Sequence, residues 1–316
     1  MQEAIGGYFE LELPRYEEYH KDALRLNSGK NCIEYILLYR NYTKVYVPYY
    51  TCDVVYKPLK KLGIAYEFYH INIHLEIAQE IHLKPGEALL YTNYYGLKQW
   101  YVEKLAQQYG NSLIVDNSQA FYAKPLEGID TFYTSRKFFG VPDGAYLYTD
   151  AVLNEEFEQS ISYDRFDHLL KRIDLSAGEG FGDYHKNEDL LEPQPIQKMS
   201  KLTRRMMQGI DYEAAAQKRR NNYQMLHERL GKENNLELLL VGNAVPMVYP
   251  FLVKEKGLRE KLIENKVFIA RYWPNVLEGT KPGDIDYLLA SLMQPLPIDQ
   301  RYGEEEMKRI IEIINN

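Results

Sequence analysis

Short apolar runs alternate with segments of helical periodicity along the first half of the chain. Between the runs, residues 53–62 and 102–109 have the spacing of helices and end at Gly63 and Gly110. This alternation predicts an α/β fold with an open, mostly parallel sheet flanked by helices, which binds ligands beyond the carboxyl ends of its strands. The runs that we expect to form strands are residues 44–47, 64–69, 88–91, 113–115, 131–133 and 145–148.

The alternation stops at about residue 151. Residues 151–201 contain one helical segment, at 165–173, and a polar glycine-rich stretch, at 176–182, so we interpret them as a crossover and interface region. We predict a large domain over residues 1–205 and a smaller C-terminal α+β domain over residues 206–316. In the smaller domain we expect helices at 212–230, 258–265 and 304–314 and strands at 236–240, 247–252 and 267–270.

Two features of the second half have plain interpretations. Lys218, Arg219 and Arg220 are expected on the solvated face of the long helix. Gly178, Gly180 and Gly182 have the spacing of a dinucleotide-binding loop, but no strand precedes them, so we discount that motif.

The composition excludes several classes of protein. The net charge of -7 makes nucleic acid or an anionic membrane surface an unsuitable partner. The 316 residues, 45% of them hydrophobic, are enough for a large domain and a smaller one. No apolar stretch has membrane-spanning length and the N-terminus lacks a signal pattern, so we expect a cytoplasmic protein. Cys32 and Cys52 cannot build a disulfide framework or a zinc site, and residues 69–74 alternate like a strand, so we expect no metal.

Asp116 and Lys137 are the residues with the clearest chemical potential. Asp116 ends one predicted strand, and Lys137 follows the next one 21 residues later. A lysine that forms a Schiff base and an aspartate that pairs with a pyridinium nitrogen are what pyridoxal phosphate chemistry requires. Taken singly, the aspartate could equally be a strand-end cap and the lysine a solvated surface residue.

A third segment could bind phosphate. Ser28 and Gly29 open a helix that carries apolar residues at Ile33, Ile36 and Leu37. Free backbone N–H groups at such a terminus bind phosphate, and Lys30 adds a positive charge. The same turn could also be no more than a helix start.

These segments and several others resemble the DegT/DnrJ/StrS-type sugar aminotransferases, which have the fold type I architecture of pyridoxal phosphate enzymes. The resemblance spans nearly the whole chain. It rests on Ser28-Gly29, on Val47-Pro48-Tyr49-Tyr50-Thr51, on Asn93-Tyr94-Tyr95-Gly96, on Asp116-Asn117-Ser118-Gln119-Ala120, and on Lys137 followed by Asp143-Gly144.

The resemblance implies roles for individual residues. Lys137 would hold the cofactor and move protons, Asp116 would keep the ring nitrogen protonated, and Gln119 would bind the ring oxygen. Tyr50 or Cys52 would cover the ring, and Arg271 and Tyr95 would contact substrate. The phosphate would lie among Ser28, Gly29, Lys30, Asn31, Ser135 and Arg136.

The sequence departs from the family pattern at three places. Cys52 stands where many relatives have an aromatic residue, and Phe132 stands where they have a serine, whose role we assign to Ser135. Where relatives have the asparagine that a neighbouring subunit lends to the phosphate, this chain has Ile196-Gln197-Lys198, and Asn187 is the candidate that we consider for that role. The crossover is also shorter than in typical members of the family.

The resemblance implies a homodimer with shared active sites. Its reaction would transfer an amino group from glutamate or another amino acid to a nucleotide-linked keto sugar, in polysaccharide or cell-surface glycan biosynthesis. Two alternatives stay open: a dehydratase acting on such sugars, and a non-catalytic binding protein. Lys137 favours transamination, because relatives that dehydrate commonly have histidine in its place.

Overall fold

The computed structural model describes residues 5–255 and 257–316, and its main layer is a seven-stranded sheet. The strand order is β1-β7-β6-β5-β4-β2-β3. The neighbours in the run from β3 to β6 pair in parallel, whereas β7 is antiparallel to both β6 and β1. The six predicted strands are confirmed, and β1 is an additional strand. Their bounds are β1 Leu24–Leu26, β2 Lys44–Pro48, β3 Ala65–Tyr69, β4 Glu87–Thr92, β5 Leu113–Asp116, β6 Asp130–Thr134 and β7 Ala145–Tyr148.

Both faces of this sheet are covered, which explains the continuous apolar runs of its central strands. Every residue of β4 and β5 is buried. On β4, Leu90 faces an apolar cluster that includes α1 (Gly29–Arg40) and α2 (Lys57–Leu62), whereas Leu89 faces a larger cluster that includes α3 (Gln99–Tyr109).

One predicted helix is broken. Residues 53–62 form the 3-10 helix η1 (Asp53–Val55) and then α2, which begins at Lys57. Pro58 lacks an N–H group and its ring would clash inside a continuous helix, so the helix restarts where Pro58 falls in the first turn. The other 3-10 helices of the described chain are η2 (Tyr94–Gly96), η3 (Gly110–Ser112) and η4 (Ser135–Lys137).

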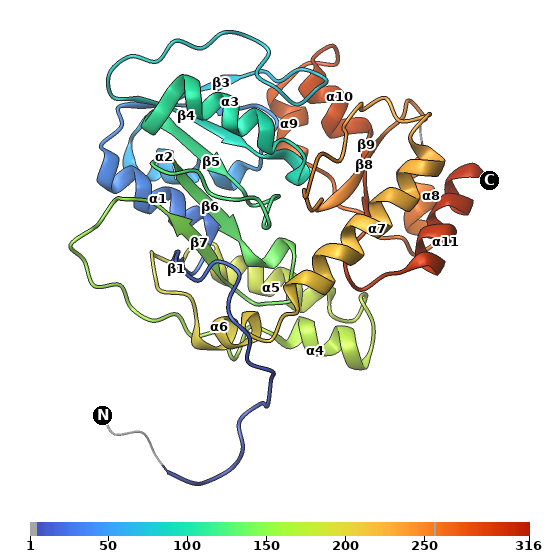
Figure 1. The fold of residues 1–316 in the computed structure, drawn as a ribbon, viewed down its shortest axis with the longest axis horizontal. Coiled ribbons are helices and arrows are strands. Elements are labelled where there is room, and N and C mark those ends of the chain that lie inside the picture. The colour runs from blue at the N-terminus through green and yellow to red at the C-terminus, as the bar shows by residue number, and fades with distance from the viewer. Residues whose placement is uncertain (1–4, 256) are drawn as a thin grey trace.

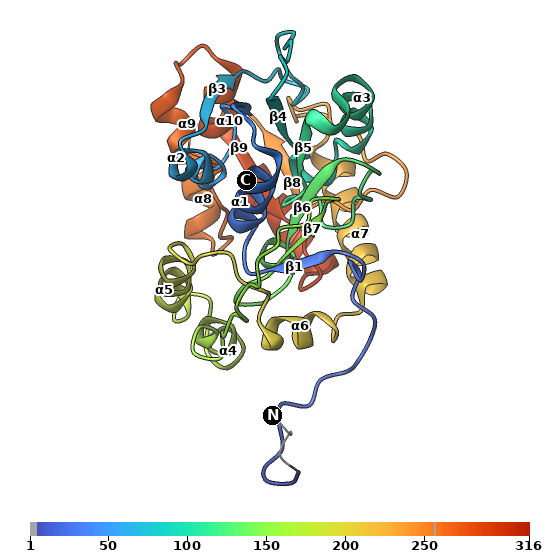
Figure 2. The ribbon, with the colours of Figure 1, turned by 90° about the vertical axis from the view of Figure 1, so that its left-hand side faces the viewer.

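The crossover contains more helix than expected. It forms α4 (Asp167–Asp174) and α5 (Phe181–Leu191), and α6 (Lys201–Met207) begins at its last residue; of the three helices only α4 was predicted. Figure 2 shows the three helices grouped at one end of the sheet, with the chain before β1 extending away beyond them.

The elements after α6 form the C-terminal unit, which we define as residues 212–316. Figure 1 shows them gathered at one side of the large sheet. The predicted helices at 212–230, 258–265 and 304–314 and the strand at 247–252 are confirmed, with small shifts of their ends. The unit contains α7 (Tyr212–Leu230), β8 (Val248–Leu252), α8 (Leu258–Glu264), α9 (Pro274–Gly279), α10 (Ile285–Leu292), β9 (Met293–Pro297) and α11 (Glu304–Asn315), with β8 and β9 antiparallel.

The predicted strands at 236–240 and 267–270 are wrong. Residues 236–240 alternate between buried and exposed beside β8, as a strand would. The backbone of β8 there forms hydrogen bonds with side chains, however, and not with a neighbouring strand. Asn234 donates to the Pro250 carbonyl at 2.8 Å and accepts from the Leu252 amide at 2.9 Å. In residues 267–270, Val267 is buried and Phe268 is exposed, as in a strand, yet no neighbouring strand pairs with them in the described chain.

The expectation for Arg219 is also wrong. Its side chain is only 1% exposed, whereas Lys218 is exposed. Arg219 belongs to the stripe of α7 residues that faces the core, between Ala215 and Tyr223.

Neither a membrane helix nor a metal cluster is present among the described residues. No helix there is long and apolar enough to cross a membrane. No group of three or more His, Cys, Asp or Glu side chains is placed to hold a metal ion. Nδ1 of His70 instead lies 2.7 Å from Asp286 of α10.

Candidate active site

The residues singled out in five separate segments meet at one edge of the large sheet. Strands β2, β4, β5 and β6 run in parallel, and β1 runs in the same direction because β7 is antiparallel to both β1 and β6. Their carboxyl ends therefore share one edge. Tyr50 and Cys52 follow β2, Tyr95 follows β4, Asp116 ends β5, Lys137 follows β6, and Ser28 to Asn31 follow β1.

Lys137 is the last residue of η4, and its side chain is exposed at this edge. Its Nζ donates to Oγ of Ser118 at 3.1 Å, across the end of β5. Burial raises the pKa of the Cys52 thiol, and the nearby charge of Lys137 opposes that rise. The Lys137 amine therefore contacts Ser118 and is close enough to Cys52 to influence its pKa. Sequence reasoning did not single out Ser118, although it belongs to the Asp116–Ala120 motif.

The carboxylate of Asp116 is buried, but the protein offers it few hydrogen-bond donors. Its side chain is 4% exposed, and Oδ1 accepts from the Ser118 amide at 2.8 Å. Among the described residues this is the one hydrogen bond that the carboxylate accepts. A buried charge is stable only when it is paired, so this carboxylate suits a cationic group of a ligand.

Two buried donors at the same edge lack partners. Gln119 accepts from the Tyr95 amide at 2.9 Å through Oε1, but its Nε2 has no hydrogen-bond partner in the described part of the chain. The same holds for Oγ of Ser135. Because buried donors are rarely left unpaired, both atoms fit an oxygen-rich ligand, and together with Asp116 they match what pyridoxal phosphate needs.

The start of α1 is pressed against the end of β6. Oγ of Ser28 caps the helix by accepting from the Asn31 amide at 3.2 Å. A Cβ atom at Gly29 would lie 2.6 Å from Cγ2 of Thr134, so no larger residue fits there. This close approach places the helix N-terminus next to the strand that precedes Lys137.

Three of the expected phosphate ligands contact the crossover instead. Nζ of Lys30 donates to the carbonyls of Glu192 and, at 3.4 Å, Gln194, and the side-chain Nδ2 of Asn31 donates to the Pro195 carbonyl at 2.7 Å. Arg136 forms an ion pair with Glu188 of α5. Of the six predicted phosphate ligands, Ser28, Gly29 and Ser135 are the ones without a hydrogen bond or ion pair to the crossover in the described chain.

Tyr50 lies in the core, while Cys52 is half-buried. The Tyr50 hydroxyl forms a 2.7 Å hydrogen bond with that of Tyr95, and its ring packs edge-on against Trp273 with centroids 5.1 Å apart. Tyr50 is fully buried, so its ring is engaged by protein.

The C-terminal unit approaches this edge through Tyr95. The ring of Tyr272 stacks on that of Tyr95 at 6.2 Å, and the Met247 amide donates to the Tyr95 carbonyl at 2.9 Å. Arg271, one residue before Tyr272, is exposed. The structure thus brings the neighbour of Arg271 to Tyr95 and leaves the arginine itself in solvent.

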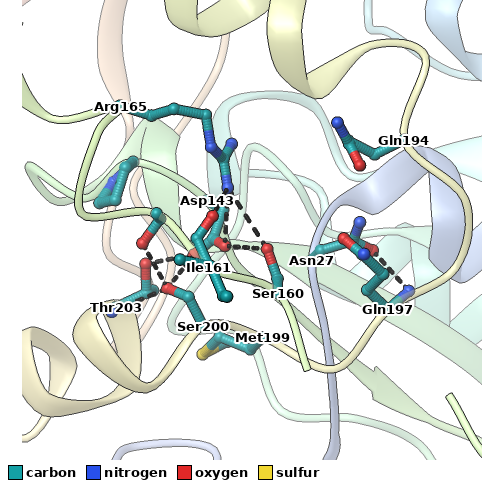
Figure 3. A network of polar contacts seen from close by, with 12 residues as sticks. Asn27, Asp143, Ser160, Ile161, Arg165, Gln194, Gln197, Met199, Ser200 and Thr203 are labelled. Carbon is teal, nitrogen blue, oxygen red and sulfur yellow. Dashed lines mark hydrogen bonds and ion pairs between the residues drawn. The ribbon is translucent and has the colours of Figure 1, made fainter. Parts of the chain in front are cut away.

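A buried polar network fastens the crossover to the loop after Lys137 (Figure 3). At its centre is Asp143, which is fully buried and accepts from the hydroxyls of Ser160 at 3.0 Å, Ser200 at 2.9 Å and also Thr203. Arg165 forms an ion pair with it at 3.4 Å. The sequence resemblance pointed to Asp143, but its partners lie up to 60 residues away and no local pattern links them.

Asn187 is part of the same assembly. Its Nδ2 donates to the Pro142 carbonyl at 2.9 Å, and its Oδ1 accepts from Arg165 at 3.4 Å. Because the residue is buried and both ends of its amide are engaged, the structure uses Asn187 within its own chain.

No protein-family model and no curated protein matches the chain. Solved structures do match. A DegT DnrJ EryC1 StrS aminotransferase from Brucella abortus is 14% identical with a TM-score of 0.63, over 93% of this chain and 85% of that one. The sugar aminotransferase CalS13 from Micromonospora echinospora is 12% identical with a TM-score of 0.66, over 93% and 87%.

A third match has a different activity. The E coli GDP-4-keto-6-deoxy-D-mannose-3-dehydratase with bound hydrated PLP is 14% identical with a TM-score of 0.61, over 92% of this chain and 87% of that one. At these identities the likeness establishes the fold. The predicted fold is confirmed: a mostly parallel sheet flanked by helices and a smaller C-terminal unit, as in fold type I enzymes.

Proposed function

We propose that this protein is a pyridoxal-phosphate-dependent aminotransferase that transfers an amino group from glutamate or another amino acid to a nucleotide-linked keto sugar. The observation that carries the proposal is the placement of Lys137 and the buried Asp116 at one sheet edge, beside the unpaired donors of Gln119 and Ser135. Structures of the same fold include sugar aminotransferases, and the dehydratase of the same fold contains hydrated PLP.

Each residue has a proposed role that follows from its surroundings. Lys137 would hold the cofactor and would carry protons, a role that suits an exposed amine with a single hydrogen bond, to Ser118. Asp116 holds the proton on the ring nitrogen, and Gln119 donates Nε2 to the ring oxygen. The cofactor, when bound, supplies the electron sink for the reaction.

The start of α1 and Ser135 are the proposed phosphate site. The N-terminal N–H groups of this helix and the unpaired Oγ of Ser135 lie at the same edge as Lys137. Lys30, Asn31 and Arg136 complete the site if the crossover segment 188–195 releases them. Half-buried Cys52 is the residue that we place against the ring, and exposed Arg271 is the one that we place against the substrate. Tyr95 is fully buried in contact with Tyr50 and Tyr272.

We further infer a homodimer whose active sites lie at the subunit interface. The crossover exposes large apolar side chains, including Ile173 at 80% and Tyr163 at 73%, which a second copy would cover. Sedimentation velocity is expected to give twice the chain mass of 37.2 kDa, and a monomer at micromolar concentration would contradict the inference. A cytoplasmic location is expected for such an enzyme and is checked by cell fractionation.

Cofactor trapping tests the proposed function. Purified protein mixed with pyridoxal phosphate is expected to turn yellow, and borohydride is expected to fix the cofactor to Lys137 in a peptide map. If the cofactor does not bind, or if the label lies on another lysine, the catalytic proposal fails. The result would then support the alternative of a non-catalytic binding protein.

A second step identifies the reaction. The loaded protein is first incubated with glutamate, and formation of 2-oxoglutarate is measured. Keto-sugar nucleotides are then added and the products are analysed by mass spectrometry. An amino sugar supports the proposal, whereas loss of a sugar hydroxyl without amination supports the dehydratase alternative.

A further inference from the structure

Arg219 of α7 is a buried guanidinium that donates mostly to carbonyl oxygens. Its Nε donates to Oε1 of Gln300 at 3.0 Å, its Nη1 to the Met247 carbonyl at 2.9 Å and its Nη2 to the Phe138 carbonyl at 3.2 Å. Within residues 5–255 and 257–316 no carboxylate accepts a hydrogen bond from it. Burial lowers the pKa of Arg219 to about 10, so the side chain stays charged at neutral pH.

Three contacts of the C-terminal unit converge on Phe138, the residue directly after Lys137. Besides Nη2 of Arg219, Nε2 of Gln300 donates to the Phe138 carbonyl, at 2.9 Å. The guanidinium carbon of Arg219 also lies 4.5 Å from the centroid of the Phe138 ring. The carbonyl next to the lysine is therefore held by two buried or half-buried donors from outside the large sheet.

The segment from Lys137 to Gly144 is held at both ends. At its far end Asp143 accepts hydrogen bonds from the crossover, and at its near end Phe138 is held by the C-terminal unit. At the near end, the backbone amides of Phe138 and Phe139 also donate to the Ser135 carbonyl, at 3.1 and 2.9 Å, and so close the turn that contains Lys137. These two amides therefore report whether the turn that carries Lys137 keeps its conformation.

We propose that Arg219 is a positioning residue, which with Gln300 sets the conformation of the Lys137 turn through the Phe138 carbonyl. The inference rests on the proposed role of Lys137. The planar, multiply donating guanidinium reaches Met247, Gln300 and Phe138 at once, which a lysine cannot do. If the chain divides near residue 205, as the sequence predicts, the contact also links the two domains to the reacting amine.

Hydrogen exchange in the cofactor-free protein tests the positioning directly. In Arg219→Lys and Gln300→Ala, exchange at the amides of Phe138 and Phe139 is expected to accelerate about tenfold, the effect of losing one hydrogen bond. The matched control is Arg220→Lys, because Arg220 lies on the same helix but donates to the carbonyls of Ala244 and Asn243. Gln300→Ala removes a half-buried amide and keeps the test valid if Arg219→Lys fails to fold.

The loaded enzyme gives the second measurement. We expect both variants to lower the rate of the glutamate half-reaction about tenfold with unchanged KM, and to shift the pH midpoint of the cofactor absorbance band. Unchanged exchange at Phe138 and Phe139 in both variants would overturn the inference, as would a lowered Tm with an unchanged pH profile. Because the exchange measurement needs no cofactor, its result is independent of whether the wild-type protein binds pyridoxal phosphate.

Discussion

Replacing Lys137 with alanine is expected to abolish covalent attachment of pyridoxal phosphate and to slow the glutamate half-reaction by at least about 10³-fold. The amine is the group that we propose both binds the cofactor and transfers protons, and Ser118, its hydrogen-bond partner, cannot replace it. Borohydride labelling and single-turnover absorbance measurements check the two losses separately.

Two controls make this result specific to the amine. Lys124→Ala removes an exposed lysine on the loop after Ala120 and is expected to label and react like the wild type. Small primary amines in the buffer are expected to restore part of the proton transfer in Lys137→Ala, because they reach an exposed position. Full activity of Lys137→Ala without added amine would exclude the proposed role.

Asp116→Asn is the variant with the second largest expected effect. The substitution keeps the shape of the side chain and removes a buried charge, so the ring nitrogen loses its counterion. We expect the half-reaction to slow by about 10²- to 10⁴-fold, corresponding to about 3–5 kcal/mol for breaking a buried charge pair. Stopped-flow absorbance measures the rate, and dialysis measures retention of the cofactor.

The pattern of losses distinguishes this variant from the lysine variant. Asp116→Asn keeps Lys137, so borohydride is still expected to fix the cofactor there. Asp22→Asn, an exposed aspartate outside the site, provides the control for the loss of one charge. A wild-type rate in Asp116→Asn would show that its carboxylate does not pair with the cofactor ring.

Local pattern was sufficient for the part of the fold that is buried on both faces. Strands β4 and β5 are continuous apolar runs because helices cover both sides of the sheet. A run of that kind can be predicted from the sequence without knowing which strand pairs with it. Residues 236–240 show the limit of the same reasoning. They alternate correctly, but a strand also needs a neighbouring edge, and Asn234 and Asn235 already occupy the edge of β8.

The candidate site divides in the same way. Asp116 and Lys137 could be predicted because Asp116 ends and Lys137 follows a strand that the apolar pattern predicts, and parallel strands bring their carboxyl ends together. Ser118, Arg165 and Arg219 could not, because their roles come from contacts with residues 19, 22 and 81 positions away. The charge of Arg219 predicted a solvent-exposed side chain, and only the carbonyl groups that accept its hydrogen bonds explain why it is buried.

The sequence by itself determined the alternation of strands and helices between residues 44 and 148 and the chemistry available at the carboxyl edge of the sheet, since both follow from periodicity and residue type over short stretches. The tertiary structure alone decided which polar side chains are paired. It turned Lys30, Asn31 and Arg136 toward the crossover, left donors of Gln119 and Ser135 unpaired, and held the Lys137 turn between Arg219 and Asp143. Hydrogen bonding in the interior depends on distant segments meeting, and no local pattern encodes such a meeting.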